Sequence, residues 1–224
     1  MLSVFKIHFY YITDRGGFPG DDRTRCLRLL DKIAEAASHG VDYIQLREKD
    51  LSTRDLESLA REAIDIIRKL RSGNRELRTA LLINSRTDVA LATEAAGVHL
   101  PANDVSPREV REIWKCAAGG PVPELSPGTP LISVSCHSPE EALRAAANQA
   151  TLAVFAPVFE KEDAKPTGLN ALRQACLAKI PVLALGGVTL RNANSCLQAG
   201  AAGIAAIRLF QENDIAAVVR ELRG

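Results

Sequence analysis

Eight short apolar runs divide this chain of 224 residues into repeated units, and polar, charged or glycine-rich clusters follow seven of them at once. Segments with the apolar spacing of helices separate nearly all of the runs. The runs do not alternate apolar with polar residues, which is typical of strands buried on both faces of a parallel sheet. They cover residues 9–14, 43–50, 80–86, 97–104, 131–138, 152–159, 181–187 and 203–209. This pattern predicts a single α/β domain over residues 1–224, folded as one (β/α)8 TIM barrel.

The segments between the runs predict the helices of the barrel. Ser52 is a plausible N-cap, and Ser106 and Ser138 each precede a proline at the first helical position. The expected helices cover 21–38, 52–71, a short stretch after Asp88, stretches from Ser106 and Ser138, and residues 169–178, 190–199 and 211–223.

Two segments interrupt this rhythm. Residues 117–130 hold four prolines and three glycines and are expected to be a structural linker into the fifth strand. Residues 160–168 are charged and follow the sixth strand, at the end of a barrel where catalytic loops lie. We expect the second segment to be functional, with a lid as one form of that role.

Charge and composition exclude several classes of partner. The net charge is +1 and no long run of one sign occurs, so no electrostatic footprint for nucleic acid or an anionic membrane is expected. No apolar stretch reaches the roughly 18–20 residues that span a bilayer, and the N-terminus lacks the features of a signal peptide. Five cysteines without metal-ligand spacing favour reduced thiols in a cytoplasmic protein. The sequence leaves open whether the protein forms a homo-oligomer.

The end of the second run carries a cationic cluster. Strand alternation sends Gln45, Arg47 and Lys49 to one side of the strand, toward the mouth of the barrel. Such donors suit the oxygens of a phosphate or diphosphate. The alternative is an internal ion-pair layer in which these cations pair with Glu48 and Asp50.

The third and fourth runs end in residues with two readings each. Asn84 either holds an amide-bearing ligand or caps the next helix, and the cap is favoured without further context. Asp104 either binds Mg²⁺ through water or caps the helix that begins near Ser106. His99 is interpreted as a satisfied residue of the barrel interior.

The remaining strand ends offer an acid/base group and a phosphate site. His137 is expected at the rim, where imidazole can move protons near neutral pH. Cys136 is a candidate nucleophile, although no sequence feature indicates a lowered pKa of its thiol. Gly186 and Gly187 follow the seventh strand, where barrels commonly bind phosphate through backbone N–H groups, and Arg208 after the eighth strand can add a positive charge.

Several motifs together resemble one family of barrels. ITD, QLREKD, an Asn-x-Arg-x-Asp-x-Ala-Leu-Ala stretch, GVHL, VSCHS and LALGGVT occur in order between about residues 10 and 210. This set resembles the thiamine phosphate synthase and TenI superfamily. The resemblance implies a barrel active in thiamine biosynthesis that handles a thiazole phosphate.

In synthases of that family, a thiazole phosphate nitrogen attacks the methylene of hydroxymethylpyrimidine diphosphate, and diphosphate leaves with the help of Mg²⁺ and cationic groups. The likeness implies that Lys165 corresponds to the catalytic-loop lysine and Asp104 to a magnesium ligand. It further implies substrate binding by Gln45, Arg47, Lys49, Asn84, Ser135 and Gly187.

Departures from the synthase pattern leave other functions open. Ser85 stands where synthases usually have a second magnesium aspartate, which predicts a weaker metal site. Asp88, one helical turn on, is the residue that could compensate. The segment from Glu160 to Lys165 lacks the usual threonines, and Arg208 and Ala102 replace a serine and a glutamine. One alternative is a TenI-like thiazole tautomerase with His137 as its acid/base. Another is a non-catalytic barrel that binds thiazole phosphate.

Overall fold

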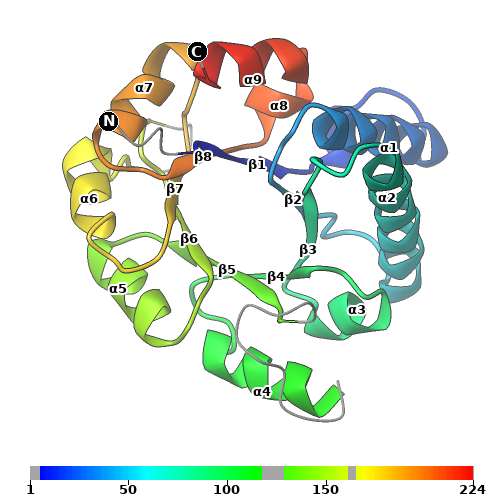
Figure 1. The fold of residues 1–224 in the computed structure, drawn as a ribbon, viewed down its shortest axis with the longest axis horizontal. Coiled ribbons are helices and arrows are strands. Elements are labelled where there is room, and N and C mark those ends of the chain that lie inside the picture. Colours follow the sequence, from blue (N-terminus) through cyan, green and yellow to red (C-terminus); the bar gives the residue numbers. More distant parts are fainter. Residues whose placement is uncertain (1–5, 118–128, 161–164, 224) are drawn as a thin grey trace.

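The computed structural model describes residues 6–117, 129–160 and 165–223. They form a closed barrel of eight parallel strands that pair in chain order, with helices around the outside (Figure 1). The strands are β1 (His8–Ile12), β2 (Tyr43–Leu46), β3 (Ala80–Asn84), β4 (Gly97–Leu100), β5 (Leu131–Cys136), β6 (Leu152–Phe155), β7 (Val182–Ala184) and β8 (Gly203–Ala206). β8 pairs with β1 and closes the barrel. The predicted (β/α)8 architecture is confirmed.

One or two helices follow each strand. They are η1 (Arg15–Gly17, a 3-10 helix), α1 (Asp22–Ser38), α2 (Thr53–Gly73), α3 (Thr87–Ala92), α4 (Pro107–Ala117), α5 (Pro139–Ala147), α6 (Gly168–Ala175), α7 (Leu190–Gln198), α8 (Arg208–Gln211) and α9 (Ile215–Arg223). The predicted caps are confirmed, because the hydroxyls of Ser52, Ser106 and Ser138 each accept a backbone N–H from the first turn of α2, α4 and α5.

The C-terminal helix differs from its prediction. The sequence predicts one helix over 211–223, whereas the structure has the short α8 and a separate α9. Asn213 donates to the carbonyl of Leu209 and so ends α8, while the carboxylate of Asp214 accepts the N–H of Ala217 at the start of α9. These side-chain bonds satisfy backbone groups that a continuous helix would pair internally.

Strand alternation divides the buried side chains into two sets. Phe9 and Tyr11 of β1 point outward and pack under the helices, whereas Tyr10 and Ile12 point into the barrel. Apolar interior residues come mainly from β1, β6, β7 and β8. Polar interior residues come from β2 to β5. The barrel interior is therefore apolar on one side and polar on the other.

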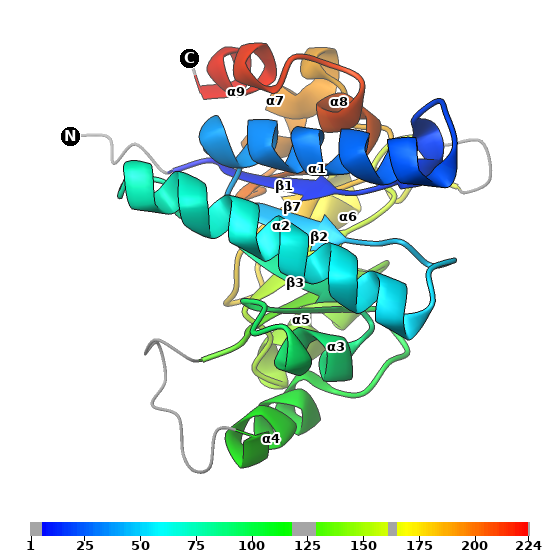
Figure 2. The ribbon, with the colours of Figure 1, turned by 90° about the vertical axis from the view of Figure 1, so that its right-hand side faces the viewer.

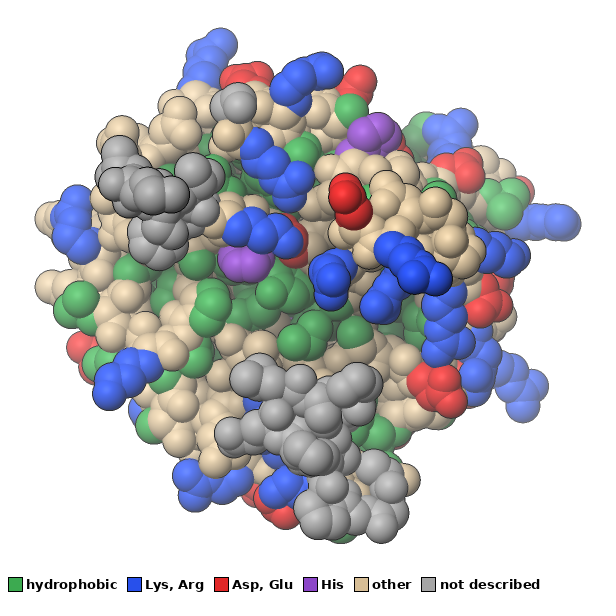
Figure 3. Space-filling model, viewed as in Figure 1, with side chains coloured by type: hydrophobic (Ala, Val, Ile, Leu, Met, Phe, Trp, Pro, Cys, Tyr) green, Lys and Arg blue, Asp and Glu red, His purple; other side chains and the backbone are tan. Residues whose placement is uncertain are grey.

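Because all strands are parallel, their carboxyl ends lie at one rim of the barrel. This rim, called the catalytic rim below, faces right in Figure 2, and Figures 1 and 3 look onto the opposite end, where the strands begin. The predicted linker over 117–130 falls largely outside the described residues, as does the middle of the charged segment 160–168. Among the described residues, no helix has both the length and the apolar character needed to cross a bilayer.

Candidate active site

The polar side of the barrel interior begins with Gln45 at the end of β2. Its Nε2 donates to Oδ1 of Asn84 at 2.7 Å, across the β2–β3 pairing. Asn84 therefore belongs to the barrel interior, and the favoured prediction that it caps α3 is wrong. Oε1 of Gln45 is buried and has no hydrogen-bond partner among the residues that the structure describes. A buried acceptor without a partner is costly, so this oxygen is ready for a donor from a ligand.

Arg47 and Lys49 follow Gln45 at the catalytic rim. Arg47 is half-buried and Lys49 is exposed. Within the described ranges, neither has a carboxylate within ion-pair distance, because both neighbouring acids are engaged elsewhere. Asp50 accepts two hydrogen bonds from Nη1 of Arg15, at 2.9 and 2.7 Å, and Glu48 lies 4.0 Å from the same nitrogen. The predicted ion-pair layer between these cations and the acids of their own segment is wrong.

A buried network fixes the backbone beneath Arg47. Thr13, which follows β1, donates its hydroxyl to Oε1 of Glu48 and accepts the N–H of Arg47 at 2.9 Å. The N–H of Arg15 donates to Oε2 of Glu48 at 3.0 Å. Both Arg15 and Glu48 are 5% exposed, and burial raises the pKa of the Glu48 carboxyl. The network ties the turn after β1 to the segment that carries Arg47 and Lys49.

Sequence reasoning did not single out Arg15. It lies on the short helix η1, which carries no apolar periodicity. The available signal was the adjacency of the first two strands in a barrel, which places the DRGG turn (residues 14–17) beside the end of β2.

His99 of β4 is a satisfied interior residue, as predicted. Its Nδ1 lies 2.9 Å from Oγ of Ser133, and its Nε2 lies 2.9 Å from Oγ of Ser135. Burial, with a smaller contribution from the charge of Arg47, lowers the pKa of His99 to about 3. The imidazole is therefore neutral near pH 7, with one nitrogen donating and the other accepting, and it orients the hydroxyl of Ser135.

The neutral state of His99 predicts a dependence of stability on pH. The unfolded chain takes up a proton at this histidine below about pH 6.5, whereas the folded chain does so only near pH 3. Stability is therefore lost as the pH falls through that window, and the free energy of unfolding should drop by about 2 kcal/mol between about pH 7 and pH 5. Urea unfolding at both pH values measures this drop. The His99→Gln variant should lose most of it, and an equal drop in the variant contradicts the assignment.

His137 lies beyond the end of β5 and is exposed. Its Nδ1 is 2.7 Å from the carbonyl oxygen of Ala156, which can only accept, so Nδ1 carries the proton. Nε2 is left to exchange a proton when the ring is neutral.

The adjacent Cys136 is fully buried, and burial raises the pKa of its thiol to about 12. A nucleophilic role for Cys136 is thus contradicted.

Gly186 and Gly187 connect β7 to α7. Both have positive φ, +92° and +66°, and both pack against the segment after β6. A Cβ at Gly186 would lie 2.6 Å from Cα of Pro157, and one at Gly187 would lie 2.8 Å from the carbonyl oxygen of Glu160. The glycines are therefore required by the joint between these two strand ends. Arg208 is exposed at the start of α8, after the next strand.

The predicted metal ligand stands apart from other acids. Asp104 is exposed, and its Oδ1 accepts the N–H of Val105, so it does not cap α4. Asp88 pairs with Arg86 and is engaged outside the barrel interior. In the described part of the chain, no three His, Cys, Asp or Glu side chains form a group that could hold a metal ion. Lys165 is exposed.

Most of the predicted site residues lie around the catalytic rim, where each interacts with a neighbouring one. Gln45 contacts Asn84, the charge of Arg47 acts on His99, and His99 contacts Ser135. Further around, His137 bonds to the end of β6, against which Gly186 packs. Asp104, Lys165 and Arg208 are exposed on segments that follow the strands. Within the described ranges, their side chains make no hydrogen bond or ion pair with these residues. An arrangement of donors and cations at one rim can hold an anionic small molecule.

Comparison with known proteins points to one family. A family model described as thiamine monophosphate synthase matches residues 9–210. A thiamine-phosphate synthase of Methanoculleus marisnigri is 38% identical over 220 residues, covering 96% of this chain and 92% of that protein. A putative thiamine-phosphate synthase 2 of Aquifex aeolicus is 36% identical over 207 residues, covering 91% and 97%.

Among solved structures, the thiamine phosphate pyrophosphorylase of Pyrococcus furiosus aligns with a TM-score of 0.75 at 31% identity, covering 98% of this chain and 95% of that one. The aligned region therefore covers nearly the whole chain. On this evidence the chain belongs to the thiamine monophosphate synthase family.

Proposed function

We propose that this protein is a thiamine-phosphate synthase, which couples hydroxymethylpyrimidine diphosphate to thiazole phosphate and releases diphosphate. One observation carries the proposal most directly. Among the residues that the structure describes, Arg47 and Lys49 stand at the catalytic rim without carboxylate partners, because Arg15 engages Asp50 and lies beside Glu48. Cations kept unpaired at a rim favour a substrate with high negative charge, and a diphosphate has one. A tautomerase substrate with a single phosphate would not need this pair.

The reaction breaks the bond between the pyrimidine methylene carbon and the diphosphate oxygen, and the oxygen keeps the electron pair. The thiazole nitrogen then forms a bond to the same carbon, so no redox partner is required. Arg47 and Lys49 stabilise the charge that develops on the departing diphosphate. Because Thr13 accepts the backbone N–H of Arg47, little reorganisation of this residue accompanies the step.

The polar interior positions the pyrimidine. The unpartnered Oε1 of Gln45 accepts a hydrogen bond from the ring substituents, and Asn84 fixes the Gln45 amide. The Ser135 hydroxyl, oriented by neutral His99, contacts the same ring. On the other side of the rim, Gly187 and Arg208 bind the thiazole phosphate, and Lys165 approaches the leaving diphosphate.

Magnesium is the expected cofactor, and the residues present fit it with one protein carboxylate in place of the usual two. Mg²⁺ is commonly held by one or two carboxylates together with substrate phosphates and water. Asp104 would supply one carboxylate, and the substrate diphosphate would supply the remaining charge. Bound there, the ion would neutralise charge on the leaving group. Ser85 offers only a hydroxyl, so we expect weak metal affinity in the absence of diphosphate.

The purified protein should form thiamine phosphate from the two substrates with Mg²⁺, measured by chromatography of the product. The His137→Ala variant distinguishes a synthase from a tautomerase, because the imidazole of His137 contacts Ala156 and not the cationic cluster. A synthase should keep most of its activity in this variant. Absence of product, combined with aromatisation of the thiazole carboxylate phosphate that the substitution abolishes, would establish the tautomerase in its place. Binding of thiazole phosphate without either reaction would establish a binding barrel.

The setting of the reaction is also a proposal. We place it in the cytoplasm, consistent with five cysteines that are all free thiols. The partners are the two small substrates, and residues 1–224 act as one domain. We keep the expectation of no nucleic-acid or membrane partner, and a homo-oligomer remains open.

A further inference from the structure

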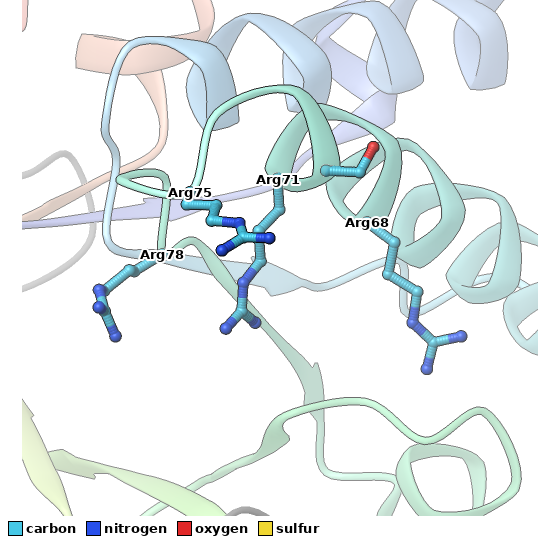
Figure 4. A pocket seen from close by; sticks show the side chains of 5 residues that line it. Arg68, Arg71, Arg75 and Arg78 are labelled. Atoms are coloured by element: carbon cyan, nitrogen blue, oxygen red, sulfur yellow. The ribbon is translucent and has the colours of Figure 1, made fainter.

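Four arginines surround a hollow at the end of the barrel opposite the catalytic rim. The hollow has a volume of about 500 Å³ and is lined by Arg68, Arg71, Ser72, Arg75 and Arg78 (Figure 4). We call it the arginine hollow. It is formed by the last turns of α2 and the connection from α2 to β3. In the view onto the barrel end where the strands begin, Lys and Arg side chains gather over this part of α2 (Figure 3).

Three of these arginines have no acidic partner in the described ranges. Arg68 is paired with Glu94, at 3.0 Å, through an exposed contact. Arg71, Arg75 and Arg78 have no carboxylate within ion-pair distance among the residues described. The nearby Glu76 lines a neighbouring hollow of about 340 Å³ and not this one.

The end of a helix explains only part of this cluster. Cations near a helix C-terminus are favoured by the helix dipole, which accounts for Arg71 in the last turn of α2. Arg68 lies before that turn and pairs with Glu94. Arg75 and Arg78 lie beyond Asn74, the C-cap, where the dipole effect has faded. The four side chains are spread along the hollow, with Arg68 and Arg78 at its two ends (Figure 4). Like charges that line one hollow repel one another, and an anion bound among them reduces that cost.

We propose that the arginine hollow is a second anion site, which binds a small oligophosphate with two or more linked phosphate groups. The planar guanidinium fork matches phosphate oxygens in pairs, and several forks around one cavity match a chain of phosphates. The volume lies within the range of small-molecule sites, about 300–1,000 Å³. Nucleic acid is less suitable, because a basic stripe along one face is its usual footprint and the chain has a net charge of only +1.

Titration calorimetry with inorganic tripolyphosphate tests the proposal. The catalytic rim also attracts this anion, so the titration uses the Arg47→Ala/Lys49→Ala variant, in which the rim is weakened. This variant should still bind one equivalent of tripolyphosphate, and it should bind orthophosphate more weakly. Adding Arg71→Gln and Arg75→Gln should weaken the remaining binding by at least about 10-fold, because two charge-assisted contacts are lost.

A matched control removes the same charge elsewhere. Arg28 and Arg220 are exposed on α1 and α9, and the Arg28→Gln/Arg220→Gln pair on the same background should change the affinity by less than about 2-fold. If both pairs of substitutions lower the affinity for tripolyphosphate equally, the loss reflects net charge alone, and the proposal is overturned. Complete loss of binding in Arg47→Ala/Lys49→Ala would also overturn it, since all tripolyphosphate would then bind at the rim. Preferential binding of an RNA oligonucleotide over tripolyphosphate, abolished by Arg71→Gln/Arg75→Gln, would assign the hollow to nucleic acid.

Discussion

Replacement of Arg47 by alanine should lower kcat for thiamine phosphate formation by about 100- to 1,000-fold, the usual effect of removing one group that stabilises charge in a transition state. Arg47 has no carboxylate partner among the described residues, so its charge is available to the departing diphosphate. Arg47→Lys keeps the charge but loses the paired donors, and an intermediate rate is expected. Steady-state kinetics with separate kcat and KM measures both variants.

Arg86 offers a matched control at the neighbouring strand end. It follows β3 and pairs with Asp88, so its charge is already neutralised locally. Arg86→Ala should change kcat by less than about 3-fold, because an exposed pair contributes little. If Arg47→Ala reduces kcat no more than Arg86→Ala does, the cationic cluster has no part in diphosphate departure.

Replacement of Arg15 by alanine should lower the free energy of unfolding by about 3–5 kcal/mol, the range for breaking a buried ion pair. The substitution leaves the buried Glu48 carboxylate without its cationic partner. Burial already raises the pKa of Glu48, and loss of Arg15 raises it further. A raised carboxyl pKa stabilises the folded state at low pH, so the deficit of the variant should shrink as the pH falls from about 7 to 5.

Two comparisons separate this effect from a general loss of packing. Arg61→Ala removes an exposed ion pair with Glu57 and should cost less than about 1 kcal/mol. In Arg15→Ala/Glu48→Gln the buried charge is absent, so part of the stability should return and the pH dependence of the deficit should disappear. Urea unfolding at two pH values measures all variants. A deficit that is independent of pH in Arg15→Ala would contradict the ion-pair explanation.

The barrel and much of its rim could be predicted because their signals are local. Each strand is an apolar run, and each helix start at Ser52, Ser106 and Ser138 is marked by residues within one turn. Parallel strand order then places Gln45, Ser135 and Gly187 at the same rim without further information.

The partners of the polar residues could not be predicted in the same way. Asn84 is compatible in sequence with a helix cap, and only the β2–β3 pairing shows that it bonds to Gln45. The split of residues 211–223 depends on Asn213 and Asp214, whose side chains satisfy backbone groups in ways that apolar periodicity does not reveal.

The fold, the order of the strands and the family follow from residue patterns that repeat along the chain. Which of the described charged side chains pair with one another follows from the three-dimensional arrangement alone. Arg15 and Glu48 are 33 positions apart, and their contact leaves Arg47 and Lys49 without acidic partners in the described part of the chain. The arginine hollow likewise arises where the chain turns from α2 into β3. Electrostatic pairing depends on distance in space, and a linear sequence does not record that distance.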